Sequence, residues 1–384
     1  MKGNACCAFA GAAIVLATNL FILAASAESK DDWVKCLSAL QIPPGERIAR
    51  CTAALETGSE AWINTSRAYF NRGRAYMDNR DFEHAISDFS QVIHFYPEAT
   101  YGYAARAAAY FWHHDFDRAI ADYARLIELD PRDRLAFMYR GQTYEAMGNL
   151  DQSIAEYNRA LEIDPKLVGA YYLRGHAYAA KSDFDDALSN YNKAIELDPK
   201  FRPAYLGRAD LYRGRGDFDR ALADYDLVIQ LDPKNGRSFR ERGIGDFEAG
   251  LLSKSLDDFT QSIALNPKDP YTVLWLDIVA NRSKLASHIA DLSAELDMTK
   301  WPAPLVRLFR GETTSDAVFA AANDADAWEK RGQVCEANFY VGETALRRGD
   351  KEEAVRLFRL ATADCPKTFI EYSAASLELK AMAP

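Results

Sequence analysis

Apolar positions recur at a fixed period through the middle of the chain. Prolines mark this period, because successive ones stand 34 residues apart: Pro97, Pro131, Pro165, Pro199, Pro233 and Pro267. Between two prolines, apolar residues spaced three or four apart define two helices, which a short polar segment separates. The pattern therefore predicts six pairs of antiparallel helices over residues 66–269.

Small residues indicate where the predicted helices approach each other closely. In the first helix of each pair they are Gly73, Ala107, Gly141, Gly175, Ala209 and Gly243, and tyrosine follows three places later in all but the last. In the second helix they are Ala85, Ala119, Ser153, Ala187, Ala221 and Ser255, each followed four places later by Phe or Tyr. A spacing of four puts both residues on one helical face, so each pair supplies a small-large contact. Asp246 stands where the sixth tyrosine is expected, so that helix pair is degenerate.

The segments between paired helices contain a helix-capping residue. They read NRDFE, HHDFD, MGNLD, KSDFD and RGDFD. An Asp or Asn side chain at such a position accepts a hydrogen bond from the first turn of the helix that follows. We therefore expect each second helix to begin directly after this residue.

Together these columns resemble the tetratricopeptide repeat. The resemblance implies an all-α fold, a superhelix of stacked antiparallel hairpins (an α-solenoid), because one hairpin cannot bury its apolar face alone. Six repeats span residues 66–269, after a helical cap at 28–65. An irregular helical region is expected at 270–334. A further repeat-like hairpin with a capping helix is expected at 335–384, where Gly342, Ala354, Phe358 and Pro366 occupy the same columns.

Composition and charge restrict the class of partner. The chain has 384 residues, of which 48% are hydrophobic, and its formal net charge is -10. Nucleic acid binding needs a basic stripe to neutralise phosphates, and none is visible in the sequence. We expect proteins or peptides as partners instead.

The first 27 residues resemble an export signal. Lys2 supplies a positive end, residues 8–24 are largely apolar, and Ala25-Ser26-Ala27 has the small-x-small form that signal peptidase cleaves. The alternative is an uncleaved membrane anchor, although several alanines make residues 8–24 a weak span. We expect cleavage, a mature chain that begins at Glu28 in the periplasm, and no membrane span in that mature chain.

Four cysteines remain after such cleavage: Cys36, Cys51, Cys335 and Cys365. An even number in an oxidising compartment favours disulfides, and the absence of a CxxC motif disfavours zinc or redox sites. We expect Cys36 to pair with Cys51, which would staple the N-terminal cap. Cys335 is expected to start one helix and Cys365 to end its antiparallel partner, so these two should also pair; the alternative is two buried free thiols.

The C-terminal third carries a more particular resemblance. Residues 266–282, 300–312 and 336–382 are similar to the corresponding parts of NlpI-type tetratricopeptide proteins of the Gram-negative envelope. That resemblance implies a non-enzymatic homodimeric adaptor, which docks a periplasmic tail-specific protease together with peptidoglycan hydrolases. One departure is that no cysteine follows the predicted cleavage site, which puts tethering to the outer membrane in doubt. A structural scaffold for an envelope assembly or secretion complex remains the alternative.

The first helices of such repeats line the concave face of the superhelix. Positions three before, one after and four after each small residue should point into it, and Tyr101 is expected near one end. The peptide-binding candidates are Phe70, Arg74, Tyr101, Phe111, Met138, Tyr172, His176, Leu206, Arg240 and Phe247. This aromatic and mixed lining suits a peptide held by side-chain pockets, and differs from a Lys/Asn/Arg clamp for a terminal carboxylate. The alternative is that many of these residues only pack between repeats.

No catalytic, metal or cofactor motif is apparent. The six histidines lack an HExxH spacing, and no GxSxG is present. The segment GRGDFD from Gly214 lacks the third glycine of a dinucleotide fingerprint and lies between helices. We therefore expect neither catalysis, nor a bound metal, nor a cofactor.

Overall fold

The computed structural model describes residues 31–38, 42–57, 62–366 and 369–382, so the expected signal peptide at 1–27 lies outside the described residues. The described part of the chain is helical and contains no strand, which confirms the all-α fold. The chain divides into two compact units, residues 1–165 and 166–384. We describe each unit by itself.

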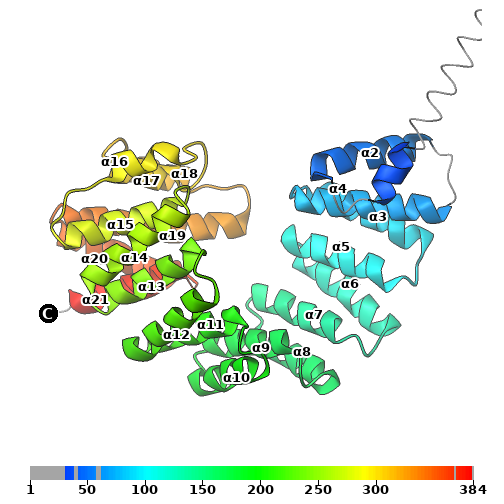
Figure 1. Ribbon diagram of the computed structural model, residues 1–384, viewed down its shortest axis with the longest axis horizontal. Helices are drawn as coiled ribbons and strands as arrows, with labels where there is room; N and C mark the ends of the chain where they lie inside the picture. Colours follow the sequence, from blue (N-terminus) through cyan, green and yellow to red (C-terminus); the bar gives the residue numbers. More distant parts are fainter. Residues whose placement is uncertain (1–30, 39–41, 58–61, 367–368, 383–384) are drawn as a thin grey trace, which may run out of the picture. The chain divides into compact units, whose positions relative to one another are not determined.

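Unit 1 is a row of helix hairpins. Residues 31–37 are helical, and they precede α2 (Pro44–Thr57), α3 (Trp62–Asp78), α4 (Phe82–Phe95), α5 (Thr100–Trp112), α6 (Phe116–Leu129), α7 (Arg134–Ala146) and α8 (Leu150–Ile163). Each helix from α2 onward packs against the next along the chain, so that α3–α4, α5–α6 and α7–α8 form successive hairpins (Figure 1). These hairpins are the first three of the six expected repeats.

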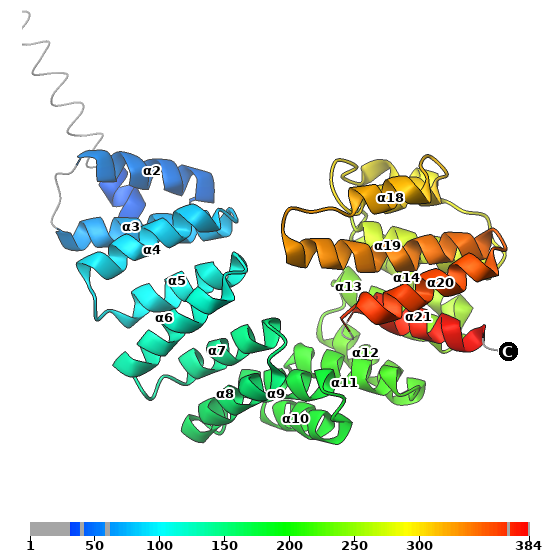
Figure 2. The same ribbon diagram turned by 180° about the vertical axis from the view of Figure 1, so that it is seen from behind.

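Unit 2 begins with three more hairpins and ends in a less regular part. The hairpin helices are α9 (Val168–Ala180), α10 (Phe184–Leu197), α11 (Arg202–Gly214), α12 (Phe218–Leu231), α13 (Gly236–Glu248) and α14 (Leu252–Leu265). They are followed by α15 (Pro270–Arg282), α16 (Ile289–Leu292), the 3-10 helix η1 (Ser293–Glu295), α17 (Ala303–Phe309) and α18 (Ser315–Ala321). The chain then forms α19 (Ala327–Arg347), α20 (Lys351–Asp364) and α21 (Ile370–Ala381), which pack together (Figure 2).

The small-large columns set the spacing within each hairpin. Tyr191 is 1% exposed, and a Cβ added to Gly175 would lie 2.9 Å from two of its ring carbons. A Cβ added to Gly141 would likewise come within 2.8 Å of the ring of Tyr157. The ring therefore lies directly on the backbone of the first helix, and glycine is present because no side chain fits there.

The turns within the hairpins share a left-handed residue, with φ between 59° and 81°. These residues are Arg80, His114, Gly148, Ser182, Gly216 and Gly250. The residue that follows caps the next helix at Asp81, Asp115 and Asp217, each of which accepts a hydrogen bond from a backbone N–H of the first turn. Asn149 and Asp183 make no such side-chain bond, so the capping prediction is confirmed only in part.

An arginine in every first helix pairs with the second helix of the same hairpin. The arginines are Arg72, Arg106, Arg140, Arg174, Arg208 and Arg242, and their acceptors sixteen residues later are Asp88, Asp122, Glu156, Asn190, Asp224 and Asp258, at 2.6 to 2.9 Å. Each guanidinium also lies 5.4 to 5.9 Å from the centre of an aromatic ring three residues earlier in its own helix. We call these pairs the arginine ladder.

Several ladder arginines also bind the preceding hairpin. Arg106 donates to Ser90 at 3.1 Å, and Arg242 donates to Asp226 at 2.5 Å. A bidentate guanidinium on a largely buried carboxylate is a strong, directional contact. The ladder therefore fixes both the geometry within a hairpin and its register on the hairpin before it.

The C-terminal part of unit 2 has a large continuous core, which α13 and α14 share with α15 to α21. Trp275 of α15 is 1% exposed and lies between Phe259 of α14, at 6.2 Å, and Phe339 of α19, at 5.5 Å between ring centres. The degenerate sixth repeat is thus not a free end, because the irregular region packs directly against it.

Both expected disulfides are present in the structure. Cys36 joins Cys51 with 4.8 Å between the Cα atoms, and Cys335 joins Cys365 with 5.1 Å. One expectation about the second pair is wrong: α19 begins at Ala327, so Cys335 lies inside this long helix and not at its start. The two cysteines still pair, because α20 is shorter than α19 and its C-terminal end lies beside Cys335.

Candidate binding surfaces

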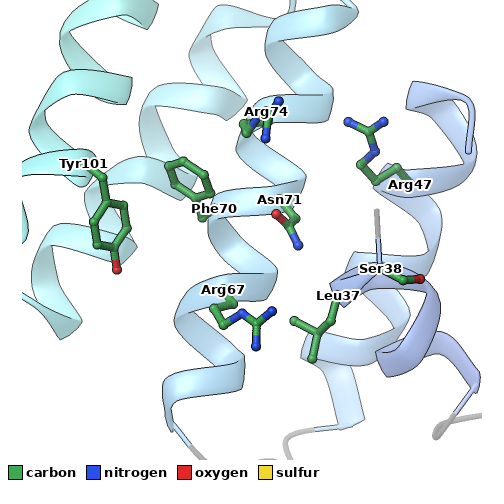
Figure 3. Close-up of a pocket in the computed structure, with 8 residues that line it drawn as sticks. All are labelled: Leu37, Ser38, Arg47, Arg67, Phe70, Asn71, Arg74 and Tyr101. Carbon is green, nitrogen blue, oxygen red and sulfur yellow. The ribbon is translucent and has the colours of Figure 1, made fainter. Parts of the chain in front are cut away.

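The first repeat of unit 1 and the N-terminal cap enclose a cavity of about 400 Å³. Its lining consists of Leu37, Ser38, Arg47, Arg67, Phe70, Asn71, Arg74 and Tyr101 (Figure 3). We call it the α3 cavity, because α3 supplies four of these residues. Three of the candidates expected from the sequence, Phe70, Arg74 and Tyr101, lie here together.

Two aromatic side chains form one wall of the α3 cavity. The rings of Phe70 and Tyr101 meet edge to face, with their centres 5.4 Å apart. Phe70 is anchored from behind by Phe89 at 5.7 Å, whereas Tyr101 remains 46% exposed. An apolar side chain could pack against this pair and remove its exposed surface from water.

Arginines form the rest of the α3 cavity wall. Arg67 and Arg74 are exposed, and neither makes an ion pair or a side-chain hydrogen bond with another described residue. Arg47 is 9% exposed and donates to Asp78 and to the carbonyl of Ile42, both at 3.2 Å. Its Nε is buried and has no hydrogen-bond partner among the described residues.

The cavity is held open by the cap. The side-chain amide of Asn71 donates to the carbonyl of Cys36 at 2.9 Å, and Cys36 is itself fixed to α2 by the disulfide to Cys51. Because the disulfide and this hydrogen bond lock the cap onto α3, the lining residues from both elements are positioned in advance.

A second cavity, of about 490 Å³, lies within unit 2 and has the C-terminal helix as a wall. His176 from the expected groove lines it, together with Tyr372, Ser373 and Lys380 of α21. Arg213 of α11 donates to Glu248 of α13 at 2.7 Å and to Ser373 at 3.0 Å. The chain's own C-terminal helix α21 therefore lines this cavity together with the first helices α9 and α11 of two repeats in unit 2.

Buried carboxylates hold α21 against its neighbours. Arg282 of α15 bridges Glu343 of α19, at 2.8 Å, and Glu378 of α21, at 2.9 Å. Burial raises the pKa of Glu343 to about 7, and the negative charge of Glu378 adds to this effect.

A second buried acid lies on α19. Glu336 accepts hydrogen bonds from Tyr271 at 2.9 Å and from Trp301 at 2.7 Å. Burial, followed by the charge of Glu371 on α21, raises the pKa of Glu336 to about 8. These acids on α19 therefore carry protons at pH values where an exposed glutamate is ionised.

The remaining groove candidates are not among the residues that line the α3 cavity. Phe111 packs beside the Ala107–Tyr110 cluster, Met138 is buried, and Leu206 packs beside Ala209 and Tyr225. Tyr172 lies 6.5 Å from His176, between ring centres.

Arg240 and Phe247 are engaged inside unit 2. Arg240 pairs with Asp269 at 2.7 Å. Phe247 is 8% exposed and packs against Trp275 at 5.7 Å. These two side chains serve packing in this structure, as the alternative reading of the sequence allowed.

Sequence reasoning missed Arg47, Arg67 and Asn71. Arg67 stands seven residues before Arg74, which is two helical turns and therefore the same face of α3. This spacing was the available signal. Arg47 belongs to the cap, whose placement on α3 no repeat pattern predicts.

The described residues contain no group of His, Cys, Asp or Glu side chains arranged to hold a metal ion. No described helix is both long and apolar enough to cross a membrane.

Comparisons with known proteins agree with the repeat pattern. Family models of the tetratricopeptide repeat match residues 66–98, 141–182, 168–201 and 203–235. The curated "Lipoprotein NlpI homolog" of Haemophilus influenzae is 29% identical over 124 residues. That match covers 30% of this chain and spans 39% of the relative's length.

Several solved structures are similar to parts of this chain. A tetratricopeptide repeat protein from Parabacteroides merdae has a TM-score of 0.46 and 15% identity, covering 81% of this chain and 98% of its own. PilW, a type IV pilus biogenesis factor, has a TM-score of 0.46 and 20% identity, with coverages of 51% and 93%. YrrB, described as having an unusual peptide-binding site, has a TM-score of 0.38 and 21% identity, with coverages of 51% and 98%.

The family matches fall on the hairpins described above. The described chain is thus an all-α protein in which these segments match tetratricopeptide repeats, and it has partial similarity to an NlpI homologue.

Proposed function

We propose that this chain is a protein-interaction adaptor of the periplasm, which brings a tail-specific protease together with peptidoglycan hydrolases. The observation that carries the interaction role is the α3 cavity, where side chains from the cap and the first repeats surround an accessible space. Tetratricopeptide repeats bind polypeptides through such surfaces, because stacked helices present side-chain pockets without needing to rearrange.

Three observations support the compartment. Both disulfides lie in the core, with Cys36, Cys51 and Cys335 at 0% exposure and Cys365 at 5%. Disulfides of this kind persist in oxidising compartments. The similarity to a relative named as a lipoprotein also favours the cell envelope, and the signal-like residues 1–27 favour export.

Affinity capture from a periplasmic extract tests the adaptor proposal. The immobilised chain is expected to recover a tail-specific protease, identified by mass spectrometry, together with at least one peptidoglycan hydrolase. Repeated absence of the protease would contradict the proposal. Recovery of assembly or secretion proteins in its place would favour the scaffold alternative.

Point substitutions in the NlpI-like C-terminal region test whether it binds the protease, and they do so better than a deletion of that region. Removing residues 270–384 would expose the core that α13 and α14 share with this region. Arg359 and Leu360 are exposed on α20, so changing both to Glu leaves the core intact. The double variant is expected to lose the protease, whereas Arg132→Glu, at an exposed site in unit 1, should retain it.

Size-exclusion chromatography with light scattering tests the homodimer that the NlpI resemblance implies. A mass near twice the 43.0 kDa of the chain would support it.

A further inference from the structure

The α3 cavity has a charge opposite to that of the whole chain. Three of its eight lining residues are arginines and none is acidic, whereas the chain carries a formal net charge of -10. A local excess of positive charge attracts negative groups and disfavours positive ones. The ligand of this cavity should therefore be negatively charged.

The charges of two of the three cavity arginines are not used by the fold. The ladder arginines are each hydrogen-bonded to the second helix of their hairpin, but the side chains of Arg67 and Arg74 bind no described residue. Arg47, by contrast, is engaged by Asp78 and by the carbonyl of Ile42, so the two exposed arginines are the ones available to a ligand.

The two exposed arginines are particular to the first repeat. The positions equivalent to Arg67 in the next five repeats hold Tyr101, Leu135, Gly169, Pro203 and Arg237. Those equivalent to Arg74 hold Ala108, Gln142, His176, Asp210 and Ile244. Only Arg237 repeats the charge, and its Nε is engaged by Glu241 at 3.2 Å. The pair of unengaged arginines thus does not follow from the repeat consensus.

The spacing of the arginines indicates what kind of anion fits. Seven residues of helix separate them by about 10 Å along the axis of α3. Figure 3 shows Phe70 and Asn71 between the two arginines, with Tyr101 facing Phe70. At this spacing, two acidic side chains on one peptide can each pair with one of the two guanidinium groups.

We propose that the α3 cavity binds an internal acidic segment of a partner protein, in which two side-chain carboxylates pair with Arg67 and Arg74 and an apolar side chain packs on Phe70 and Tyr101. This inference rests on the proposed function, since it specifies the chemistry of the segment that an adaptor would hold. Arginine suits the role because its planar fork binds carboxylates through two hydrogen bonds.

Fluorescence anisotropy with the purified full chain tests the proposal. The probe is a labelled peptide, blocked at both ends, with two glutamates that flank phenylalanine and one further residue. We expect the peptide to bind. Its affinity should fall as the salt concentration is raised, because exposed ion pairs are screened. A matched peptide with glutamines should bind at least tenfold more weakly. A peptide with neutral side chains and a free terminal carboxylate should not compete, and competition by it would overturn the choice of internal side chains.

Variants of the chain assign the binding to the cavity. Arg67→Gln and Arg74→Gln should each lower the affinity for the peptide about fivefold to tenfold, which corresponds to the loss of one charge-assisted contact. Neither should change the thermal melt, because neither arginine has an intramolecular partner among the described residues. Arg237→Gln, in the same column of the sixth repeat, is the matched control and should bind normally. Unchanged affinity in both cavity variants would overturn the inference.

The peptide-binding experiment and the protease capture experiment can fail independently of each other. A chain that captures the protease but ignores the acidic peptide contradicts only the cavity assignment. A chain that binds the peptide through Arg67 and Arg74 but captures no protease contradicts the adaptor role and supports the cavity.

Discussion

Arg106 donates two hydrogen bonds to Asp122, one from Nε and one from Nη2, both at 2.8 Å. The carboxylate is 6% exposed, so the arginine replaces the water that it loses on folding. The hydrogen bond to Asp122 raises the pKa of Arg106. The same two-bond contact with an aspartate is made by Arg72, Arg208 and Arg242.

Replacing Arg106 by Met should destabilise unit 1, because Asp122 would remain buried without its partner. We expect the free energy of unfolding to fall by about 2 kcal/mol in urea titrations. Arg125→Met is the control: Arg125 also makes an ion pair, with Glu128 at 2.9 Å, but both side chains are largely exposed. That change should cost less than about 0.5 kcal/mol.

The double variant Arg106→Met with Asp122→Leu tests whether Arg106→Met destabilises the chain because it leaves Asp122 buried without a partner. Removing both charges leaves no unpaired buried group, so the double variant should be more stable than Arg106→Met alone. Equal or greater destabilisation would mean that the ladder does not act through charge pairing.

Gly175→Val should separate the helices of its hairpin. An added Cβ already lies 2.9 Å from the Tyr191 ring, and branching adds two more carbons in the same space. We expect a loss of about 2–3 kcal/mol in the free energy of unfolding. Gly214→Val provides a comparison, since a Cβ there meets nothing within 4 Å. A smaller loss at Gly175 than at Gly214 would contradict the packing argument.

Stability should fall as the pH rises from about 5 to 8. The folded-state pKa of Glu336 is raised to about 8 and that of Glu343 to about 7, above the usual 4.5. The native chain therefore binds more protons than the unfolded chain between these values, and the stabilising protonation is lost as pH passes through the folded pKa. Urea unfolding should show a decrease on the order of 2 kcal/mol over this range.

Glu336→Gln tests the origin of that pH dependence. The amide resembles the protonated acid, although its NH₂ group replaces one acceptor oxygen. The variant should lose less stability than the natural chain between pH 5 and 8. An unchanged slope would mean that Glu336 does not carry the effect.

Reduction of the Cys335–Cys365 disulfide should lower stability by about 3–4 kcal/mol, according to the loop-entropy estimate for a closed loop of 30 residues. The paired variant Cys335→Ala with Cys365→Ala, compared with the oxidised natural chain by urea unfolding, measures this loss without a reductant. If the paired variant and the oxidised natural chain have the same free energy of unfolding, the disulfide does not make the expected contribution to stability.

Much of the fold was determined locally and could therefore be predicted. Gly175 and Tyr191 belong to neighbouring helices of one hairpin, and their small-large contact recurs in other repeats. A contact that repeats every 34 residues appears as a column in the sequence. The arginine ladder has the same period and could have been recognised in the same way, from Arg106 and Asp122.

Part of the candidate site was also determined by the sequence alone. The repeat register placed Phe70 and Arg74 in the expected groove, with Tyr101 of the next repeat near one end, and the structure brings all three to one cavity. Arg47 could not be foreseen there, because its position depends on how the non-repeating cap packs on α3.

Only the tertiary structure decided how the C-terminal part closes onto the repeats of unit 2. Arg282 meets Glu378 across 96 residues of sequence, and Arg213 meets Ser373 across 160. Such contacts occur once and leave no period in the sequence, since their partners are specified by packing between elements that are remote along the chain. Short-range repetition thus fixed the hairpins, whereas unique long-range burial placed α21 beside α11 and gave Glu336 and Glu343 their raised pKa values.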